Sequence, residues 1–141
     1  MQVLLPIKSL SNAKGRLCEL LDQSHRQGLF KAMTHDVLAV LTAQTEISGV
    51  ILISDDPVAE LLADEYGIEL MTERALKVAG LNEAIQAAVL KLASRKINDV
   101  MIIHADIPLV NGPSLSELIS RHHCLKGPKM SIIPDRHRIG S

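Results

Sequence analysis

A single aspartate, Asp106, stands directly after an apolar run and directly before an Ile-Pro pair. A carboxylate at the point where the chain leaves a buried strand can hold Mg²⁺ between a triphosphate and an attacking oxygen. An aspartate in this position can equally cap a helix or form a turn, and for a lone aspartate those roles are more common. The metal role therefore depends on which other charged groups the fold brings beside Asp106.

Three cations, Lys8, Lys14 and Arg16, occupy the polar loop that follows the first apolar run. A nucleoside triphosphate needs such groups, because lysine supplies a point charge, arginine grips two oxygens and backbone amides approach the phosphates. The loop matches neither the GxGxxG dinucleotide fingerprint nor the GxxxxGK[ST] P-loop. A solvated basic loop would have the same composition, and the spacing alone does not separate the two interpretations.

Two further segments carry side chains that suit a nucleoside or a helix cap. Asp55 and Asp56 could hold a ribose or a second metal, but they precede Pro57, and proline favours the first position of a helix. The cap interpretation is therefore preferred for this pair. Asn82 could cap a helix and also read a base or ribose, and these two roles are compatible.

Two other groups of ionisable residues, one histidine pair and one charged turn, lie toward the end of the sequence. His122 and His123, followed by Cys124, fall near a predicted helix end, where cationic side chains suit the helix dipole. A surface position is favoured over a metal site for them, because no second ligand cluster lies nearby in the sequence. The charged turn at residues 135–138 is the best local candidate for binding an anionic substrate.

Apolar runs predict the strands that would position these groups. Short aliphatic or β-branched stretches bounded by polar residues are typical of strands buried in a sheet. Five such strands are predicted, at residues 3–7, 50–54, 68–71, 100–104 and 130–133.

Longer segments with helical periodicity alternate with these strands. Capping-box spacing from Ser24 to Gln27 predicts the start of a first helix. Its apolar face is assigned to Leu29, Met33, Val37, Val40 and Leu41. Three more helices are predicted: residues 57–66, ended by Gly67; a helix introduced by Gly80 that runs through about residue 94; and residues 114–123.

This alternation predicts a Rossmann-like α/β fold, a mainly parallel sheet with helices on both faces and right-handed crossovers. Ligands of such sheets bind at the carboxyl ends of the strands. Four loops should therefore meet at one edge, at residues 8–16, 54–57, 104–108 and 135–141. These loops hold most of the charged groups considered above.

Composition limits the classes of function. The 141 residues predict one domain, 1–141, with a core of its own, and 47% of them are hydrophobic. One Phe, one Tyr, no Trp and a net charge of -1 argue against nucleic acid as a partner. The sequence contains no apolar stretch of membrane-spanning length, no signal-peptide pattern and only two distant cysteines, so we expect a cytoplasmic protein without a membrane partner. The function classes that remain are small-molecule chemistry and binding to another protein.

Five motifs occur in order along the whole chain. They are Pro6-x-Lys8-x5-Ala13-Lys14-x-Arg16-Leu17, Ser54-Asp55-Asp56-Pro57, Gly80-Leu81-Asn82, Ala105-Asp106-Ile107-Pro108-Leu109 and Pro134-Asp135-Arg136-His137-x2-Gly140. Each motif alone is weak, but the ordered set resembles the 2-phospho-L-lactate guanylyltransferase family of coenzyme F-420 biosynthesis. That family belongs with the molybdenum-cofactor guanylyltransferases and the sugar nucleotidyltransferases, so the resemblance implies a nucleotide-diphospho-sugar transferase fold.

The resemblance implies a reaction and a set of partners. A phosphorylated three-carbon acid (2-phospho-L-lactate, phosphoenolpyruvate or 3-phosphoglycerate) would attack the α-phosphorus of GTP and release pyrophosphate. The mechanism would be in-line displacement helped by positioning and electrostatics.

The resemblance also implies roles for individual residues. Lys8, Lys14 and Arg16 would neutralise the triphosphate and the developing charge, and Asp106 would hold Mg²⁺. Nucleoside binding would involve Asp55, Gly80 and Asn82. Contacts to the phosphate or carboxylate of the acceptor acid would come from Arg136, Gly140 and Ser141.

The sequence departs from the family at its end. Family members continue beyond the Asp-Arg-His-x-x-Gly segment with a second metal-binding acid and part of the substrate pocket, whereas this sequence stops at Ser141. We therefore expect that a C-terminal portion is missing and that half of the metal site lies in it. An exposed strand at the sheet edge would favour a homodimer or poor solubility.

Two other functions stay open. One is a nucleotidyltransferase with a sugar-phosphate or molybdopterin acceptor, which would usually carry a Gly-rich signature where this chain has Pro6-Ile7-Lys8. The other is a non-catalytic α/β binding module that keeps the fold without the chemistry.

Overall fold

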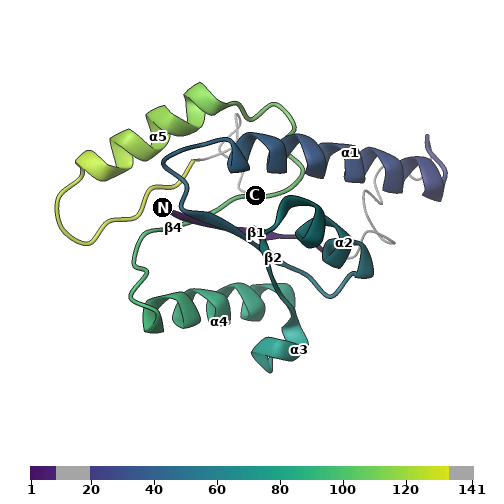
Figure 1. Cartoon of the computed structure of the whole chain (residues 1–141), viewed down its shortest axis with the longest axis horizontal. Coiled ribbons are helices and arrows are strands. Elements are labelled where there is room, and N and C mark those ends of the chain that lie inside the picture. Colours follow the sequence, from purple (N-terminus) through teal and green to yellow (C-terminus); the bar gives the residue numbers. More distant parts are fainter. Residues whose placement is uncertain (9–19, 134–141) are drawn as a thin grey trace.

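Four parallel strands form the sheet at the centre of the protein (Figure 1). The computed structural model describes residues 1–8 and 20–133. The strands are β1 (Gln2–Pro6), β2 (Gly49–Ile53), β3 (Glu69–Met71) and β4 (Val100–Ile102), in the spatial order β3-β2-β1-β4. The four predicted strands that precede residue 105 are thus confirmed with ends shifted by one or two residues, and the sheet is parallel as predicted.

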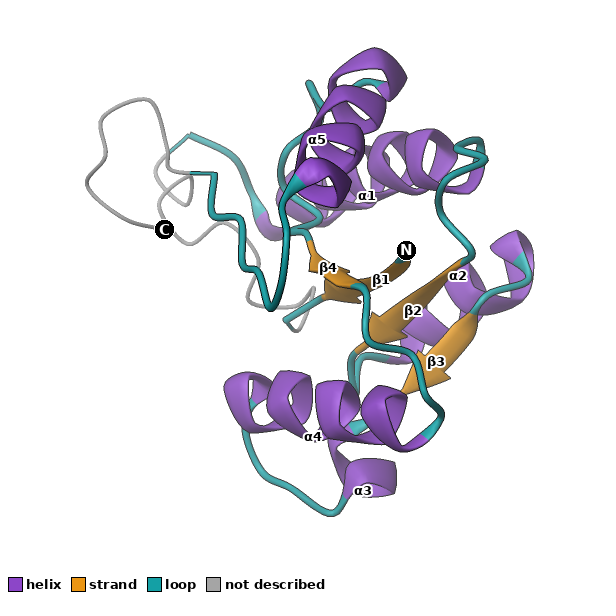
Figure 2. Cartoon of the chain, turned by 90° about the vertical axis from the view of Figure 1, so that its left-hand side faces the viewer, coloured by secondary structure: helices purple, strands orange, loops and turns teal. Residues whose placement is uncertain are grey.

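Helices cover both faces of the sheet (Figure 2). The helices are α1 (Gln23–Thr42), α2 (Pro57–Tyr66), α3 (Glu73–Leu76), α4 (Leu81–Ser94) and α5 (Gly112–Cys124). One face packs against α1, α2 and α5, and the other packs against α4 with α3 beside it. This layering confirms the predicted α/β architecture.

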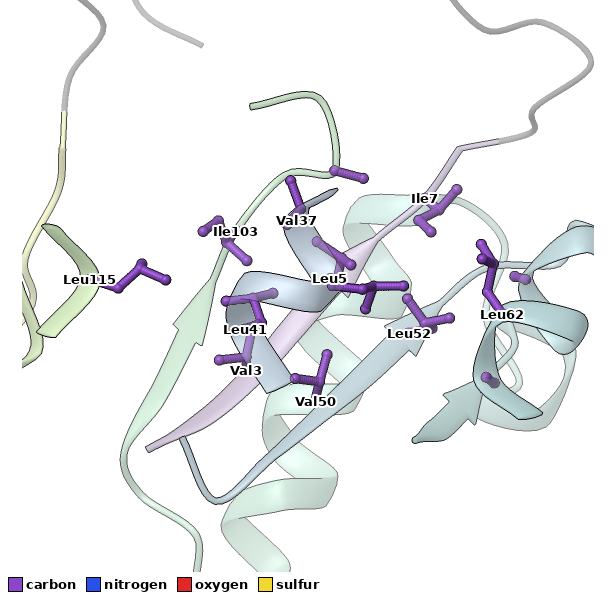
Figure 3. Close-up of a cluster of buried hydrophobic side chains, with 14 residues drawn as sticks. Val3, Leu5, Ile7, Val37, Leu41, Val50, Leu52, Leu62, Ile103 and Leu115 are labelled. Carbon is purple, nitrogen blue, oxygen red and sulfur yellow. The ribbon is translucent and has the colours of Figure 1, made fainter. Parts of the chain in front are cut away.

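The alternation of strand side chains explains the two cores. Val3, Leu5 and Ile7 lie in the cluster shared with α1 and α2, which Figure 3 shows, whereas Leu4 and Ile51 lie in the cluster shared with α4. Successive residues of a strand point to opposite faces, so a strand covered on both sides must be apolar throughout. That requirement is why the continuous apolar runs were reliable strand signals.

Helix α1 begins two residues earlier than predicted. The N-cap is Asp22 and not Ser24, because the Asp22 carboxylate accepts the His25 N–H at 2.9 Å and the Ser24 hydroxyl at 2.8 Å. These hydrogen bonds hold the pKa of Asp22 well below its usual range. The carboxylate is the better acceptor for the end of the helix, so the serine becomes its donor.

The predicted apolar face of α1 is also partly wrong. Its fully buried residues are Thr34, Val37, Leu38 and Leu41, whereas Leu29 is 40% exposed. Residues four apart along a helix share a face, but two neighbouring stripes both satisfied that spacing. Packing against the sheet, and not periodicity, selected between them.

Helix α2 agrees with its sequence signals. The Asp56 carboxylate accepts the Val58 N–H at 2.9 Å, and Pro57 occupies the first turn. Gly67 ends the helix in the left-handed region at φ 62, where glycine avoids the penalty of a side chain. The prediction of a helix over residues 57–66 is confirmed.

Three other local predictions need correction. Asn82 is not a cap, because Gly80 occupies the N-cap position of α4 and Asn82 lies inside the first turn. The short helix α3, which Thr72 caps through a 3.0 Å bond from the Ala75 N–H, was not predicted. The predicted fifth strand at residues 130–133 does not form, and Met130 is 80% exposed. An apolar run becomes a strand only where a neighbouring edge accepts its hydrogen bonds.

Within the described residues, none of the helices is both long enough and apolar enough to cross a membrane.

We expect Asn111→Ala to lower the free energy of unfolding by about 1 kcal/mol. The reason is that Asn111 is the N-cap of α5 and its side-chain oxygen accepts the Ser114 N–H at 3.0 Å. Urea unfolding followed by circular dichroism measures the change. Asn98→Ala is the matched control, because Asn98 is exposed ahead of β4. Equal destabilisation of both variants would contradict a stabilising role for the cap.

Candidate active site

The carboxyl ends of the four strands meet at one edge of the sheet and form a row of polar residues. Parallel pairing of β1 with both β2 and β4 aligns these ends. Along the edge, the row runs from Glu73 after β3, through Asp55 after β2 and Lys8 after β1, to Asp106 after β4. The prediction that the loops beginning at residues 8, 54 and 104 share one edge is confirmed for their described parts.

A pocket of about 1060 Å³ opens over the β1, β2 and β3 end of this row. Its volume is close to the upper end of the range for pockets that bind small molecules and cofactors. It brings together four of the residues predicted to bind a nucleotide, Lys8, Asp55, Gly80 and Asn82, whereas Asp106 is outside its lining. Its full lining is Ile7, Lys8, Gln27, Lys31, Asp55, Asp56, Pro57, Val58, Leu61, Glu73, Gly80, Leu81, Asn82 and Glu83.

The cations of the pocket come from β1 and α1. Lys8 is exposed just beyond the end of β1, and Lys31 reaches the pocket from α1 together with Gln27. Sequence reasoning missed Lys31, although its spacing of four residues from Gln27 places both on one face of a helix. That periodicity could have identified Lys31 only if the side of α1 that faces the loops had been known.

A polar contact fixes α1 beside α2 next to these cations. The His35 Nδ1 atom lies 3.0 Å from the Tyr66 hydroxyl, and that hydroxyl also donates to the His35 backbone oxygen at 3.3 Å. Burial raises the pKa of Tyr66, so the phenol stays protonated as a donor. Since His35 lies one turn after Lys31, this contact helps hold α1 against the last turn of α2.

The adjacent acids Asp55 and Asp56 have different surroundings. Ser54 is buried, and its hydroxyl oxygen accepts the Asp56 N–H at 3.1 Å, while the Asp56 carboxylate caps α2. Asp55 is exposed on the pocket wall. The preferred cap interpretation therefore holds for Asp56, whereas Asp55 is placed to meet a ligand.

The segment that begins α4 is anchored by a carboxylate that sequence reasoning missed. The Glu73 side chain accepts the Gly80 N–H at 2.7 Å, and the Glu73 backbone oxygen accepts the Val78 N–H at 3.1 Å. Gly80 has φ 112, a backbone conformation that residues with a side chain rarely adopt. This conformation favours glycine at the position, and Asn82 reaches the pocket from the turn that follows it.

Asp106 lies on the far side of Lys8 from the pocket. Beyond β4 the chain continues its pairing with β1 through the Ile103 N–H, which donates to the Leu4 oxygen at 3.1 Å. Ala105 is then buried at 2% exposure, and this anchors the chain so that Asp106 and His104 on either side are exposed at the edge.

Asp106 supplies part of what a magnesium site needs. Among residues 1–8 and 20–133, no three His, Cys, Asp or Glu side chains gather closely enough to hold a metal. Mg²⁺ often binds through one or two carboxylates and completes its coordination with substrate phosphates and water. The exposed Asp106 carboxylate fits one magnesium ligand of this kind, although not a complete protein cage.

The remaining predicted site residues lie outside the described residues. They are Lys14, Arg16, Arg136, Gly140 and Ser141. Their assigned roles in binding phosphate and acceptor stay predictions.

Several curated proteins resemble this chain, and their names agree. The phosphoenolpyruvate guanylyltransferase of Rhodococcus erythropolis (strain PR4) is 29% identical, over 100% of this chain and 67% of the relative. The enzyme of the same name from Conexibacter woesei is 30% identical over 98% of this chain and 60% of the relative. The 2-phospho-L-lactate guanylyltransferase of Methanosphaera stadtmanae is 31% identical, over 82% of this chain and 50% of the relative.

Solved structures support the fold. A protein described as a nucleotide-diphospho-sugar transferase, from Desulfovibrio desulfuricans G20, superposes with a TM-score of 0.70 at 15% identity. That match covers 87% of this chain and 54% of the other. A cytidylyltransferase from Leptospira borgpetersenii matches with a TM-score of 0.57 at 14% identity, over 85% of this chain and 47% of the other. At these identities the likeness concerns the fold alone.

The chain spans between half and two thirds of the length of these curated relatives. Residues 1–131 match the family model described as "Guanylyl transferase CofC like". This match includes the pocket and Asp106. The chain therefore belongs to the CofC-like guanylyltransferase family of nucleotidyltransferases.

Proposed function

We propose that this chain carries the nucleotide site of an enzyme that transfers GMP from GTP to a phosphorylated three-carbon acid and releases pyrophosphate. Relatives named for phosphoenolpyruvate and for 2-phospho-L-lactate support both the nucleotide and the class of acceptor. The product would enter the synthesis of coenzyme F-420, as the ordered motifs imply. Which of 2-phospho-L-lactate, phosphoenolpyruvate and 3-phosphoglycerate is the acceptor would depend on the residues of the acceptor site.

The order of charges along the sheet edge is the observation that carries this proposal. Asp55, Glu73 and Glu83 line the pocket at the β2–β3 side and would repel phosphates, so this side suits the ribose and base. Lys8 follows the adjacent strand β1, and Asp106 follows β4 beyond it. A nucleotide laid along the edge would thus place its nucleoside in the pocket, its phosphates at Lys8 and its reacting phosphorus toward Asp106.

The protein's chemical work is positioning and charge neutralisation. Lys8, with Lys14 and Arg16 in the loop that follows, would hold the triphosphate and offset the charge that develops as pyrophosphate leaves. The phosphate oxygen of the acceptor acid would attack the α-phosphorus opposite the leaving pyrophosphate, in line. Arg136, Gly140 and Ser141 are the proposed contacts to the acceptor.

Mg²⁺ is the proposed cofactor, with Asp106 as its ligand from this chain. When bound, Mg²⁺ would neutralise the triphosphate oxygens and make the α-phosphorus more open to attack. The Asp106 carboxylate would fix the position of that charge relative to Lys8.

The direct test is pyrophosphate release from GTP and Mg²⁺ with each candidate acid in turn, using the 141-residue chain and a full-length relative. We expect Asp106→Asn to reduce turnover to background, because the amide is a poorer magnesium ligand of almost the same shape. Its unfolding curve should match that of the unsubstituted protein. Unchanged turnover would show that Asp106 is only a turn residue, and no pyrophosphate from either protein would remove the enzymatic proposal.

We expect Lys8→Ala to weaken GTP binding roughly tenfold at low salt, because a charged contact to phosphate is lost. The loss should shrink as ionic strength rises, since salt screens exposed charges. Calorimetric titration with GTP at two salt concentrations measures both effects. Lys126→Ala is the control, because Lys126 is exposed after α5 and away from the pocket. A salt-independent loss in Lys8→Ala would contradict phosphate binding.

The two neighbouring aspartates should separate ligand binding from stability. We expect Asp55→Ala to weaken GTP binding about tenfold with little change in unfolding, because it removes an acceptor for the ribose hydroxyls. Asp56→Ala should lower the free energy of unfolding by about 1 kcal/mol and leave GTP affinity nearly unchanged, because it removes the cap of α2. Titration calorimetry and thermal unfolding of both variants check this. Weaker GTP binding in Asp56→Ala, with unchanged GTP binding in Asp55→Ala, would reverse the assignment.

A further inference from the structure

We propose that Leu61, on the exposed side of α2, covers one face of the nucleobase in the pocket and so contributes affinity for the nucleoside without reading its edge. This inference rests on the proposed function, because it assigns a contact within the same nucleotide site. It names a residue outside the five ordered motifs.

Leu61 is 67% exposed and yet lines the pocket. Val58 lies one turn before it on the same face of α2 and also lines the pocket. Leu81 reaches the pocket from the start of α4, which packs against the opposite face of the sheet. The pocket thus has an aliphatic wall on each side of its nucleoside end.

The chemistry of a purine explains why such walls are useful. The two faces of the base are apolar, and proteins commonly cover them with aromatic rings. Among the described residues that line this pocket there is no Phe, Tyr or Trp. Aliphatic side chains must therefore bury the faces of the base, and Leu61 is the lining leucine with the most surface left to lose.

The charges of the pocket favour a base near the acidic residues. Glu73 and Glu83 line the pocket together with Leu81, and their carboxylates repel phosphates. Lys8 after β1 and Lys31 on α1 also line it and attract the phosphates. A base kept away from these two cations would have the α2 and α4 walls on its two sides, where Leu61 can cover one face.

Exposure alone does not place a leucine at the pocket. Leu90 is 71% exposed on α4, but it is not part of the pocket lining. Single exposed leucines are ordinary on protein surfaces. The two side chains have the same chemistry and nearly the same exposure, so Leu90 is a matched control for Leu61.

The experiment is calorimetric titration of the unsubstituted chain, Leu61→Ala, Leu61→Met and Leu90→Ala with GTP, ITP and inorganic tripolyphosphate. We expect Leu61→Ala to lose about tenfold in affinity for GTP, from the apolar area that no longer covers the base. The loss should be equal for ITP, because a contact to the face does not sense the amino group of guanine. Tripolyphosphate affinity should be unchanged, and Leu61→Met should recover most of the GTP affinity.

The possible results separate this inference from the proposed function. If the unsubstituted chain binds tripolyphosphate but neither GTP nor ITP, the proposed nucleotide site fails and the inference falls with it. If the unsubstituted chain binds GTP and Leu61→Ala binds it as tightly as Leu90→Ala does, only the role of Leu61 is overturned. An equal loss for GTP and tripolyphosphate would also overturn it, because the substitution would then act on the whole pocket.

Discussion

Parallel pairing of β1 with β2 and β4 is the constraint on which the rest of the structure depends. Because the three strands run in the same direction and in register, every loop that follows them leaves from one edge of the sheet. Residues far apart in the chain, such as Lys8 and Asp106, thereby become neighbours along that edge. The hydrophobic burial that holds the strands together on both faces also fixes where the charges stand.

The site combines rigid and exposed parts. Capping by Asp56 and the hydrogen bond from Gly80 to Glu73 fix the starts of α2 and α4, which form two walls of the pocket. Asp55 and Lys8 are exposed between these walls. Backbone groups thus stay satisfied within the protein while the ionisable groups face the space where a nucleotide would bind.

Much of this arrangement could be predicted from local signals. The apolar runs identified β1 to β4, and Asp56-Pro57 with Gly67 identified both ends of α2. These signals succeed because burial on both faces and backbone geometry act on a few adjacent residues. The apolar run at residues 130–133 looked the same as the others but is not a strand, since a strand also needs a neighbour that the local pattern does not contain.

The sequence by itself determined the elements, the kinds of charge and the likeness to the family. Only the tertiary structure decided the order β3-β2-β1-β4, which separates the acidic side of the pocket from Lys8 and puts Asp106 beyond it. It also decided that Glu73 binds Gly80 and that Leu61 faces the pocket. Strand order and helix orientation follow from packing between distant segments, and no stretch of neighbouring residues encodes that packing alone.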